Sequence, residues 1–398
     1  MSYLKAVLLC ALVSAAALFQ ATPVQGQADA NDATSSPVAW VYVSTTPRNS
    51  SVNEIAGYAV AANGALTPLP GSPWTADVSS IASNGKYLFA SDKNSVYIDA
   101  FHIDQSTGAL SLWSEADVAK MNAQDCGGPG QLSLDRTGVT LYNFEFNDDG
   151  CSNNDYRSLA IVKANGSLHN LGATVGNDWL TAPPAMLANN VYAYAASCIG
   201  NTYWGIWGFR RESDGALTDL KNFTHAMPAS TSDDFWCPSE PAADNTGHVG
   251  MVMQSVNGSS FSADGSAQIA SFTADAGGNL TTDNTAANMP VTQIGAPLAS
   301  SMSPDGRLLA VGGTAGLQIF HFNGAGPATH YTNLKAAVEI DQMFWDQRNH
   351  LYAISRPANR LYVYEVTPSG VIEAPGSPHA IESPQGLSVL PLQPSGND

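Results

Sequence analysis

The chain of 398 residues carries 34 acidic and 16 basic side chains, which gives a formal net charge of −18. Nucleic-acid-binding proteins need basic patches to displace phosphate counterions, so this balance argues against a nucleic-acid partner and, more weakly, against a phosphorylated substrate. The length suggests two or three domains, although one domain built from repeats can reach the same length.

The N-terminus has the pattern of a secretory signal peptide. Within residues 1–26, one lysine precedes an apolar run that is too short for a stable membrane span, and small residues follow it. We expect cleavage between Ala21 and Ala28, for example after Gly26, and then a flexible segment over residues 27–37. No later stretch is apolar and long enough to span a bilayer. The sequence therefore predicts an exported protein, secreted or periplasmic, without a membrane span.

A short phrase recurs along the chain. It reads NGALTPLPGSPW at 63–74, STGALSLW at 106–113, SDGALTDL at 213–220 and PSGVIEAPGSP at 368–378. Each copy has a small polar pair, a glycine and an alternating apolar stretch, which is typical of a hairpin turn between two strands. The phrase therefore indicates a turn that the fold uses many times.

Residues 297–332 contain one complete structural repeat. A small-residue strand over 298–303 meets an SPDG turn, strands follow over 307–312 and 317–322, and a second turn and a weaker strand complete the unit. Gly306 supplies the positive φ that the first turn requires. Four short strands in about forty residues, each bounded by turn residues, indicate one blade of a β-propeller.

The two ends of the mature chain complete one another. Residues 39–46, AWVYVSTT, correspond to the second strand of a unit whose first strand is missing, and residues 384–392, PQGLSVLPL, form an isolated first strand. Six complete units and one split unit give seven, and pairing within the split unit closes the ring. We predict an all-β fold, a single seven-bladed β-propeller of four-stranded antiparallel blades over residues 38–393, with a disordered tail over 394–398.

These blades resemble those of the lactonase family of β-propellers, the YVTN-type propellers. The resemblance is carried by VYVSTT at 41–46, IAGYAVAANGALTPLPGSP at 55–73 and SMSPDGRLLAVGG at 301–313, and it covers almost all of the mature chain. It implies a seven-bladed propeller. The family includes cytoplasmic 6-phosphogluconolactonases, whose lactone chemistry is assigned to a glutamate, a histidine and an arginine, and exported members without a known activity.

One motif of the family's enzymes has a partial match. Their arginine lies in a stretch similar to Asn-Arg-Gly-His-Asp after the second strand of a blade, and the nearest match here is SRPANR at 355–360. Arg356 corresponds to the arginine, and Ala358 stands at the position of the histidine. The resemblance therefore assigns Arg356, but no neighbouring histidine, to the site.

The strand order of a propeller sorts its loops onto two faces. The SPDG-like and NGALT-like turns are short and share one face. The connections between blades, and those between second and third strands, share the other, which we call the top face. The top connections are long and irregular, for example at 146–156, 197–205 and 254–266. Irregular loops on a rigid scaffold commonly carry binding sites, so we expect function on the top face.

Four cysteines remain after the signal peptide, an even number that indicates two disulfides in an exported chain. Spacing alone allows three pairings, and no Cys-x-x-Cys or histidine spacing typical of zinc is present. The blade assignment places all four near the top face. We therefore predict the pairs Cys126–Cys151 and Cys198–Cys237, each of which would stabilise a loop by about 2–4 kcal/mol.

Acidic residues and one histidine precede the innermost strands and are expected to ring the mouth of a central funnel. They form a solvated rim, or hold a hard cation such as Ca²⁺ through several oxygens, or act on a lactone or ester. In the last case Glu240 or Glu339 directs a water and His379 shuttles a proton. The candidate catalytic residues are Glu240, Glu339, His379 and Arg356, and the candidate funnel residues are Asp77, Asp125, Asp178, Asp341, Glu382, Trp204 and Trp236.

Two tryptophans add a carbohydrate interpretation, because Trp204 and Trp236 lie in or beside top-face loops, where an indole can stack on a sugar ring. We expect a monomeric, lactonase-like propeller that needs no cofactor and binds a small sugar-like lactone or ester in the funnel, with or without hydrolysis. The alternative is a non-catalytic platform that binds a protein or a carbohydrate through the top-face loops of blades three to five.

Overall fold

The protein is described here from a computed structural model, which covers residues 36–47, 52–119, 126–145, 154–176, 180, 182–199, 203–230, 234–260 and 262–392. In these ranges the chain forms thirty β-strands and no α-helix. The predicted signal peptide and the predicted C-terminal tail lie outside the described residues.

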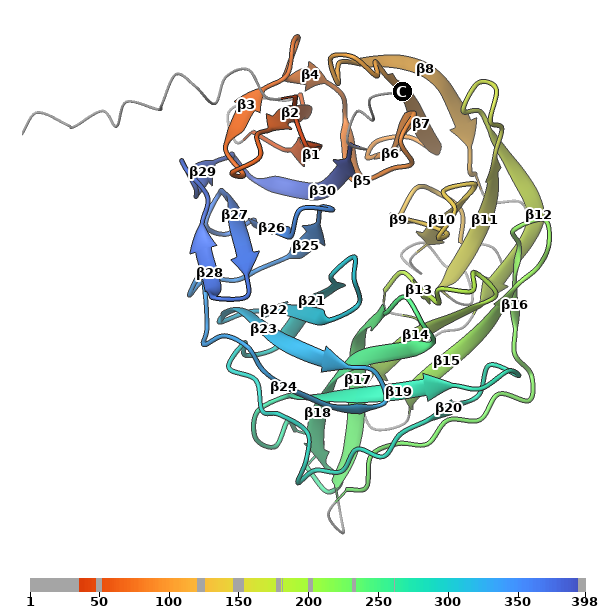
Figure 1. Ribbon diagram of the computed structural model, residues 1–398. Coiled ribbons are helices and arrows are strands. Elements are labelled where there is room, and N and C mark those ends of the chain that lie inside the picture. Colours follow the sequence, from red (N-terminus) through yellow and green to blue (C-terminus); the bar gives the residue numbers. More distant parts are fainter. Residues whose placement is uncertain are drawn as a thin grey trace, which may run out of the picture. The chain divides into compact units, whose positions relative to one another are not determined.

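The strands form seven antiparallel sheets arranged around a central axis (Figure 1). Blade 1 consists of β1 (Ala39–Thr45), β2 (Glu54–Val60), β3 (Leu66–Pro68), β4 (Trp74–Thr75) and β30 (Pro384–Pro391). Blade 2 consists of β5 (Val78–Ser83), β6 (Tyr87–Asp92), β7 (Tyr97–Ile103) and β8 (Leu110–Asp117). Blade 3 consists of β9 (Gln131–Leu134), β10 (Thr140–Glu145), β11 (Asp155–Ile161) and β12 (Leu168–Gly176). Blade 4 consists of β13 (Ala185–Met186), β14 (Tyr192–Ile199), β15 (Tyr203–Arg211) and β16 (Leu217–Asp219).

The remaining blades repeat this order. Blade 5 consists of β17 (Asp234–Ala243), β18 (His248–Asn257), β19 (Gln268–Ala274) and β20 (Leu280–Thr281). Blade 6 consists of β21 (Pro297–Met302), β22 (Leu308–Gly313), β23 (Gly316–Asn323) and β24 (Gly326–His330). Blade 7 consists of β25 (Gln342–Trp345), β26 (His350–Ser355), β27 (Arg360–Thr367), β28 (Gly370–Glu373) and β29 (His379–Ala380). Blades 1 and 7 each contain a short extra strand. In blade 1, β4 pairs with the third strand of the blade, β2, as β3 does, and in blade 7, β29 pairs with the third strand, β27, as β28 does.

The two ends of the described chain close the ring. β30 pairs antiparallel with β1, from Ala39 opposite Pro391 to Thr45 opposite Pro384. In Figure 1 the blue strand β30 lies beside the red strand β1. The sheet order β3-β2-β1-β30 completes blade 1 from both ends of the chain. This pairing confirms the predicted seven-bladed propeller with its split blade.

The recurring phrase is the hairpin turn between the third and fourth strands of a blade. In the first copy, Ala61 N–H donates to the Ala65 carbonyl at 2.9 Å, and Gly64 has a φ of +81°. Such a φ costs a glycine little but strains residues with a Cβ atom. The SPDG turn behaves similarly, because Gly306 has a φ of +72° and Asp305 accepts a hydrogen bond from Arg307 N–H. Turn geometry therefore explains the repetition.

The hydrophobic core lies between the blades. One cluster joins Val252 and Ile269 of blade 5 to Leu309, Val311 and Phe320 of blade 6, and all five side chains are buried. Burial of each such side chain contributes about 1.5–3 kcal/mol. Since each middle strand faces a neighbouring blade on both sides, its apolar residues need not alternate with polar ones.

The described residues contain no helix that could span a membrane.

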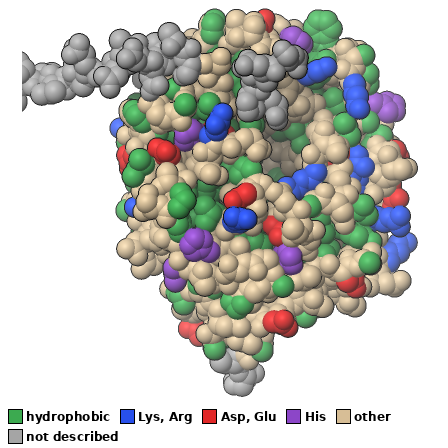
Figure 2. Space-filling view, viewed as in Figure 1, with side chains coloured by type: hydrophobic (Ala, Val, Ile, Leu, Met, Phe, Trp, Pro, Cys, Tyr) green, Lys and Arg blue, Asp and Glu red, His purple; other side chains and the backbone are tan. Residues whose placement is uncertain are grey.

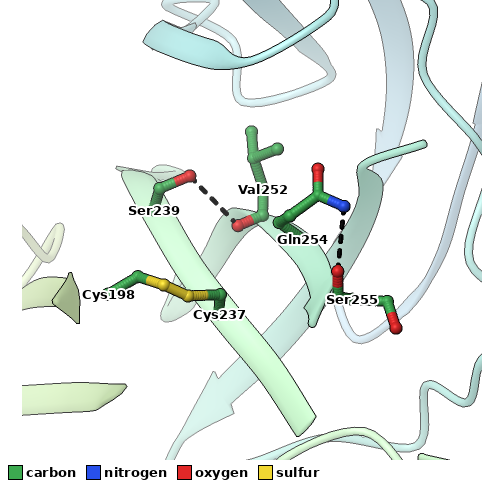
Figure 3. The surroundings of a disulfide bond; sticks show 6 residues. All are labelled: Cys198, Cys237, Ser239, Val252, Gln254 and Ser255. Carbon is green, nitrogen blue, oxygen red and sulfur yellow. Dashed lines mark hydrogen bonds between the residues drawn. A yellow bond between two sulfur atoms is a disulfide. The ribbon is translucent and has the colours of Figure 1, made fainter. Parts of the chain in front are cut away.

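A disulfide joins blades 4 and 5. Cys198 in β14 pairs with Cys237 in β17, with their Cα atoms 5.2 Å apart (Figure 3). This is one of the two predicted pairs. Cys126 is also disulfide-bonded, and Cys151 lies outside the described residues, so the Cys126–Cys151 pair stays a prediction.

Candidate functional site

A cavity of about 590 Å³ occupies the centre of the ring. Every blade contributes to its wall through its innermost strand or the residues just before that strand. Figure 2 shows a hollow near the centre of the face in view. Small-molecule sites commonly enclose about 300–1,000 Å³, so this cavity is large enough for a ligand of sugar size.

Equivalent wall positions in the seven blades can be found by counting back from the end of each innermost strand, where in blades 2 to 7 the chain turns toward the second strand. After the innermost strands of blades 2 to 7, a backbone N–H closes the turn, as from Asp135 to the Thr140 carbonyl and from Asp244 to the His248 carbonyl, each at 3.0 Å. In blade 1 the equivalent bond runs from Leu392 N–H to the Val38 carbonyl. The residue four positions before that N–H lines the cavity in every blade, and these residues form the central ring. The central ring consists of Ser80, Gln131, Pro183, Glu240, Ala299, Gln342 and Ser388. Glu240 is the one ionisable member of these seven.

The backbone of β17 is irregular at Glu240. Its register with β18 shifts between Ser239 and Ala242, and Glu240 has a φ of +47°. A non-glycine residue in this conformation costs on the order of 1–3 kcal/mol and persists only where its surroundings hold it. Here Ser300 Oγ of blade 6 donates a hydrogen bond to the Glu240 carbonyl at 2.7 Å. The neighbouring blade thus fixes the backbone that presents this carboxylate.

The Glu240 carboxylate lies in weakly polar surroundings. The cavity wall from blades 4 to 6 is built largely of proline and small apolar residues, and among the described residues no hydrogen bond or ion pair reaches this carboxylate. Desolvation by burial disfavours the charged form and raises the pKa of Glu240 from 4.5 to about 7. A carboxylate that titrates near neutrality beside a cavity can accept and return a proton there.

Asp341 lines the same cavity and is bonded to Arg356, which is not part of the wall. Asp341 directly precedes β25 and lines the wall, and its Oδ2 accepts a hydrogen bond from Arg356 N–H at 2.7 Å. The Arg356 guanidinium is 3.9 Å from Asp341 Oδ1 and its side chain is 49% exposed, so this ion pair contributes little to stability. The structure therefore brings Arg356 to the edge of the site through Asp341.

Three other predicted acidic residues are not part of the cavity wall. Asp77 precedes β5, and its carboxylate accepts hydrogen bonds from Asn53 and Asn94, so its role is local. Glu339 and Glu382 lie in the connections before β25 and β30, and neither lines the cavity. The expected ring of carboxylates is thus reduced, among the described residues, to Glu240 and Asp341.

The expectation that His379 lies at the funnel mouth is wrong. His379 begins β29, which pairs with β27 in the outer part of blade 7 rather than with the innermost strand. Trp74 holds the matching place in blade 1, and both residues follow a PGSP sequence. In each copy the serine accepts a backbone hydrogen bond, Gly57 N–H to Ser72 Oγ and Val363 N–H to Ser377 Oγ. His379 is therefore a structural element of its blade and does not reach the cavity.

Trp236 also lies outside the central cavity. It is only 5% exposed and packs in a cluster with blade 4 residues, so the expectation of a sugar-stacking residue in the funnel is wrong. It borders a separate cavity of about 310 Å³ in blade 5. Asp125, Asp178 and the side chain of Trp204 lie outside the described part of the chain.

No group of three or more His, Cys, Asp or Glu side chains in the described ranges is arranged to hold an ion. The Ca²⁺ site expected from the sequence included Asp125 and Asp178 among its acidic residues, and both lie outside these ranges. Ca²⁺ binding therefore stays a prediction.

Sequence reasoning missed most of the cavity wall. Gln131, Gln342 and Ser388 share the central ring with Glu240, and Leu298 and Phe344 line the cavity as exposed apolar side chains. None of them carries a motif. The available signal was positional, because counting back from the aligned turns brings equivalent residues of different blades together.

Comparison with solved structures supports the fold assignment. A candidate 6-phosphogluconolactonase from Bacteroides uniformis aligns with a TM-score of 0.65 and 14% identity over 88% of this chain and 99% of its own. The periplasmic gluconolactonase of Pseudomonas aeruginosa aligns with a TM-score of 0.64 and 14% identity over 89% and 99%. A candidate 6-phosphogluconolactonase from Bacteroides fragilis gives 0.61 and 14% over 88% and 98%. No family model and no curated protein sequence matches the chain.

Proposed function

We propose that the protein binds a small, uncharged lactone or ester in the central cavity and hydrolyses it with Glu240 as the general base. One observation carries the proposal: a carboxylate with a pKa of about 7 and no partner among the described residues lines a cavity of ligand size. The similarity to structures named as lactonases supports the proposal at the level of fold.

Hydrolysis requires one proton to move twice. A water between Glu240 and the ligand carbonyl gives its proton to the carboxylate while its oxygen bonds to the carbonyl carbon. The C–O bond of the lactone or ester then breaks, and the departing oxygen takes the proton back from Glu240. The products are a carboxylic acid and a hydroxyl group. A positioned general base of this kind commonly accelerates a reaction by about 10²–10⁴-fold.

The charges of the site favour an uncharged ligand. Glu240 and Asp341, the charged side chains that line the cavity among the described residues, are both acidic, and the whole chain has a net charge of −18. A phosphorylated ligand would meet this negative field without a basic group inside the wall. The same field favours release of the anionic product acid.

The test is hydrolysis of a panel of γ-lactones, δ-lactones, sugar lactones and simple esters by the wild type and by Glu240→Gln. At least one compound should be hydrolysed above the buffer rate, and the variant should lose about 100-fold or more of that rate. The matched control is Glu115→Gln, which changes an exposed glutamate on β8 in the same way and should retain the wild-type rate. Failure of the wild type with every compound, or full activity of Glu240→Gln, would overturn the proposal.

A further inference from the structure

The wall of the central cavity differs between its two sides. Blades 4 to 7 contribute Pro183, Pro184, Pro241, Leu298 and Phe344, which we call the apolar arc, and between them the polar residues Glu240, Ser300, Asp341 and Gln342. Blades 1 to 3 form a polar arc, defined here as Ser80, Ser83, Gln131 and Ser388. Since the innermost strands follow one another around the ring in blade order, the two arcs face one another across the cavity.

Within the polar arc some hydrogen-bonding capacity is already used. Ser83 Oγ and Ser388 Oγ are 2.8 Å apart, and Ser80 Oγ accepts a hydrogen bond from Leu132 N–H at 2.9 Å. No bond to the Gln131 side chain is present in the described part of the chain, which leaves its amide free for a ligand. Of the apolar residues of these blades that line the cavity, Ile81, Leu132 and Leu387 are buried in the interblade core, and Ala82, Leu134 and Val389 are half-buried.

The apolar arc exposes large side chains inside the cavity. Leu298 is 38% exposed and Phe344 is 42% exposed, and both line the wall. Apolar surface held against water is unfavourable, and a ligand that covers it gains binding free energy in proportion to the area covered. A sugar lactone with hydroxyl groups on every side would instead place some of them against this arc without a partner.

The position of Glu240 in the ring determines which wall residues surround the carbonyl group of a bound ligand. Glu240 lies in blade 5, so in ring order it stands between Pro183 of blade 4 and Leu298 of blade 6. Leu298 directly precedes the central-ring residue Ala299. Phe344 lies two residues beyond Gln342, about 7 Å further along the axis for an extended strand. A ligand whose carbonyl lies at Glu240 therefore has apolar surface on both sides along the axis.

We propose that the ligand is amphiphilic: a lactone or ester whose alkyl or aryl substituent packs against Leu298 and Phe344 while its polar end faces Gln131 and the serines. This inference rests on the proposed function and names its substrate class. Such a ligand is oriented because its substituent covers the exposed side chains of Leu298 and Phe344 in only one orientation.

The experiment compares γ-lactones with alkyl substituents of increasing length, and a sugar lactone, as substrates of the wild type, Leu298→Ser and Phe344→Ser. In the wild type, kcat/KM should rise about fourfold for each added methylene until the cavity is full. Each arc variant should lose about tenfold with the longest substrate and less than twofold with unsubstituted butyrolactone. The control Leu112→Ser removes a 56% exposed leucine on β8, outside the cavity, and should match the wild type. A sugar lactone preferred over every alkyl lactone, or equal losses at all chain lengths, would overturn the inference.

A binding measurement separates this inference from the proposed catalysis. Alkyl-substituted γ-lactams resemble the lactones but resist hydrolysis, and their affinity for Glu240→Gln can be measured by calorimetry. Affinity that rises with chain length, and rises less steeply in the Glu240→Gln, Phe344→Ser double variant, supports the amphiphilic ligand even when the wild type hydrolyses no lactone. Affinity independent of chain length contradicts it even when lactones are hydrolysed. When an arc variant does not fold, the chain-length series measured on Glu240→Gln alone decides the matter.

Discussion

The innermost strands of blades 5 and 7 place Glu240 and Gln342 at the same position of the central ring, yet the two side chains are used differently. Gln342 Oε1 accepts a hydrogen bond from Leu387 N–H at 2.8 Å and so connects blade 7 to blade 1. Glu240 offers only its backbone carbonyl to the next blade, through Ser300 Oγ at 2.7 Å. In blade 5 the connection between blades does not use the ring side chain, which leaves the carboxylate available to a ligand.

Blade 5 also has a covalent connection that blade 7 lacks among the described residues. Cys237 lies three residues before Glu240 in β17 and is bonded to Cys198 of β14. The disulfide therefore anchors the strand that carries the unpaired carboxylate and the strained backbone. Blade 5 is thus connected covalently to the preceding blade, whereas Gln342 connects blade 7 to the following one.

The largest expected effect on stability comes from removing this disulfide. The bond closes a loop with a sequence separation of 39, and loss of such a crosslink typically lowers the free energy of unfolding by about 2–4 kcal/mol. We expect this decrease for the Cys198→Ala, Cys237→Ala double variant in urea denaturation. An unchanged midpoint and slope would show that β17 does not depend on the disulfide.

The next effect is a pH-dependent gain of stability in Glu240→Gln. Because the folded-state pKa of Glu240, about 7, lies above the ordinary value of 4.5, ionisation opposes folding. The penalty is absent below pH 4.5, grows between pH 4.5 and 7, and reaches at most about 3 kcal/mol above pH 7. Glu240→Gln should therefore be more stable than the wild type at pH 8 and equal to it at pH 4.5. Equal unfolding free energies at both pH values would mean that the carboxylate is hydrated or paired.

A smaller loss is expected for Gln342→Ala. The substitution leaves Leu387 N–H without its partner between blades 7 and 1, which should lower the free energy of unfolding by about 1–2 kcal/mol. Gln131→Ala is the matched control from the same ring, because the Gln131 side chain makes no such connection, and it should change stability by less than about 0.5 kcal/mol. Equal losses in the two variants would remove the distinction between connecting and free ring residues.

The fold was predictable because its signals are local and repeated. Gly64 and Gly306 occupy turns that demand a positive φ, and these turns recur at blade spacing. The incomplete strand sets at the two ends of the chain indicated how the ring closes. Such signals do not depend on knowing which blades touch.

The site was only partly predictable because it depends on strand register. Glu240 was expected at the funnel because the sequence placed it just before an innermost strand, whereas it lies within β17 and lines the cavity at the register shift of that strand. His379 was misplaced because the extra strand β29 was not recognised, although the PGSP sequence at 70–73 and 375–378 repeats beside Trp74 and His379. Trp236 was misplaced because β17 begins at Asp234, so the indole lies within a buried strand rather than a loop.

The most direct test of the account is the pH dependence of lactone hydrolysis, corrected for the uncatalysed rate, in the wild type and in Glu240→Gln. If the Glu240 carboxylate is the general base, kcat/KM of the wild type should rise with pH through an apparent pKa near 7 and then level off, and Glu240→Gln should show no such rise. A wild-type profile without an inflection near pH 7, or the same inflection in Glu240→Gln, would contradict it.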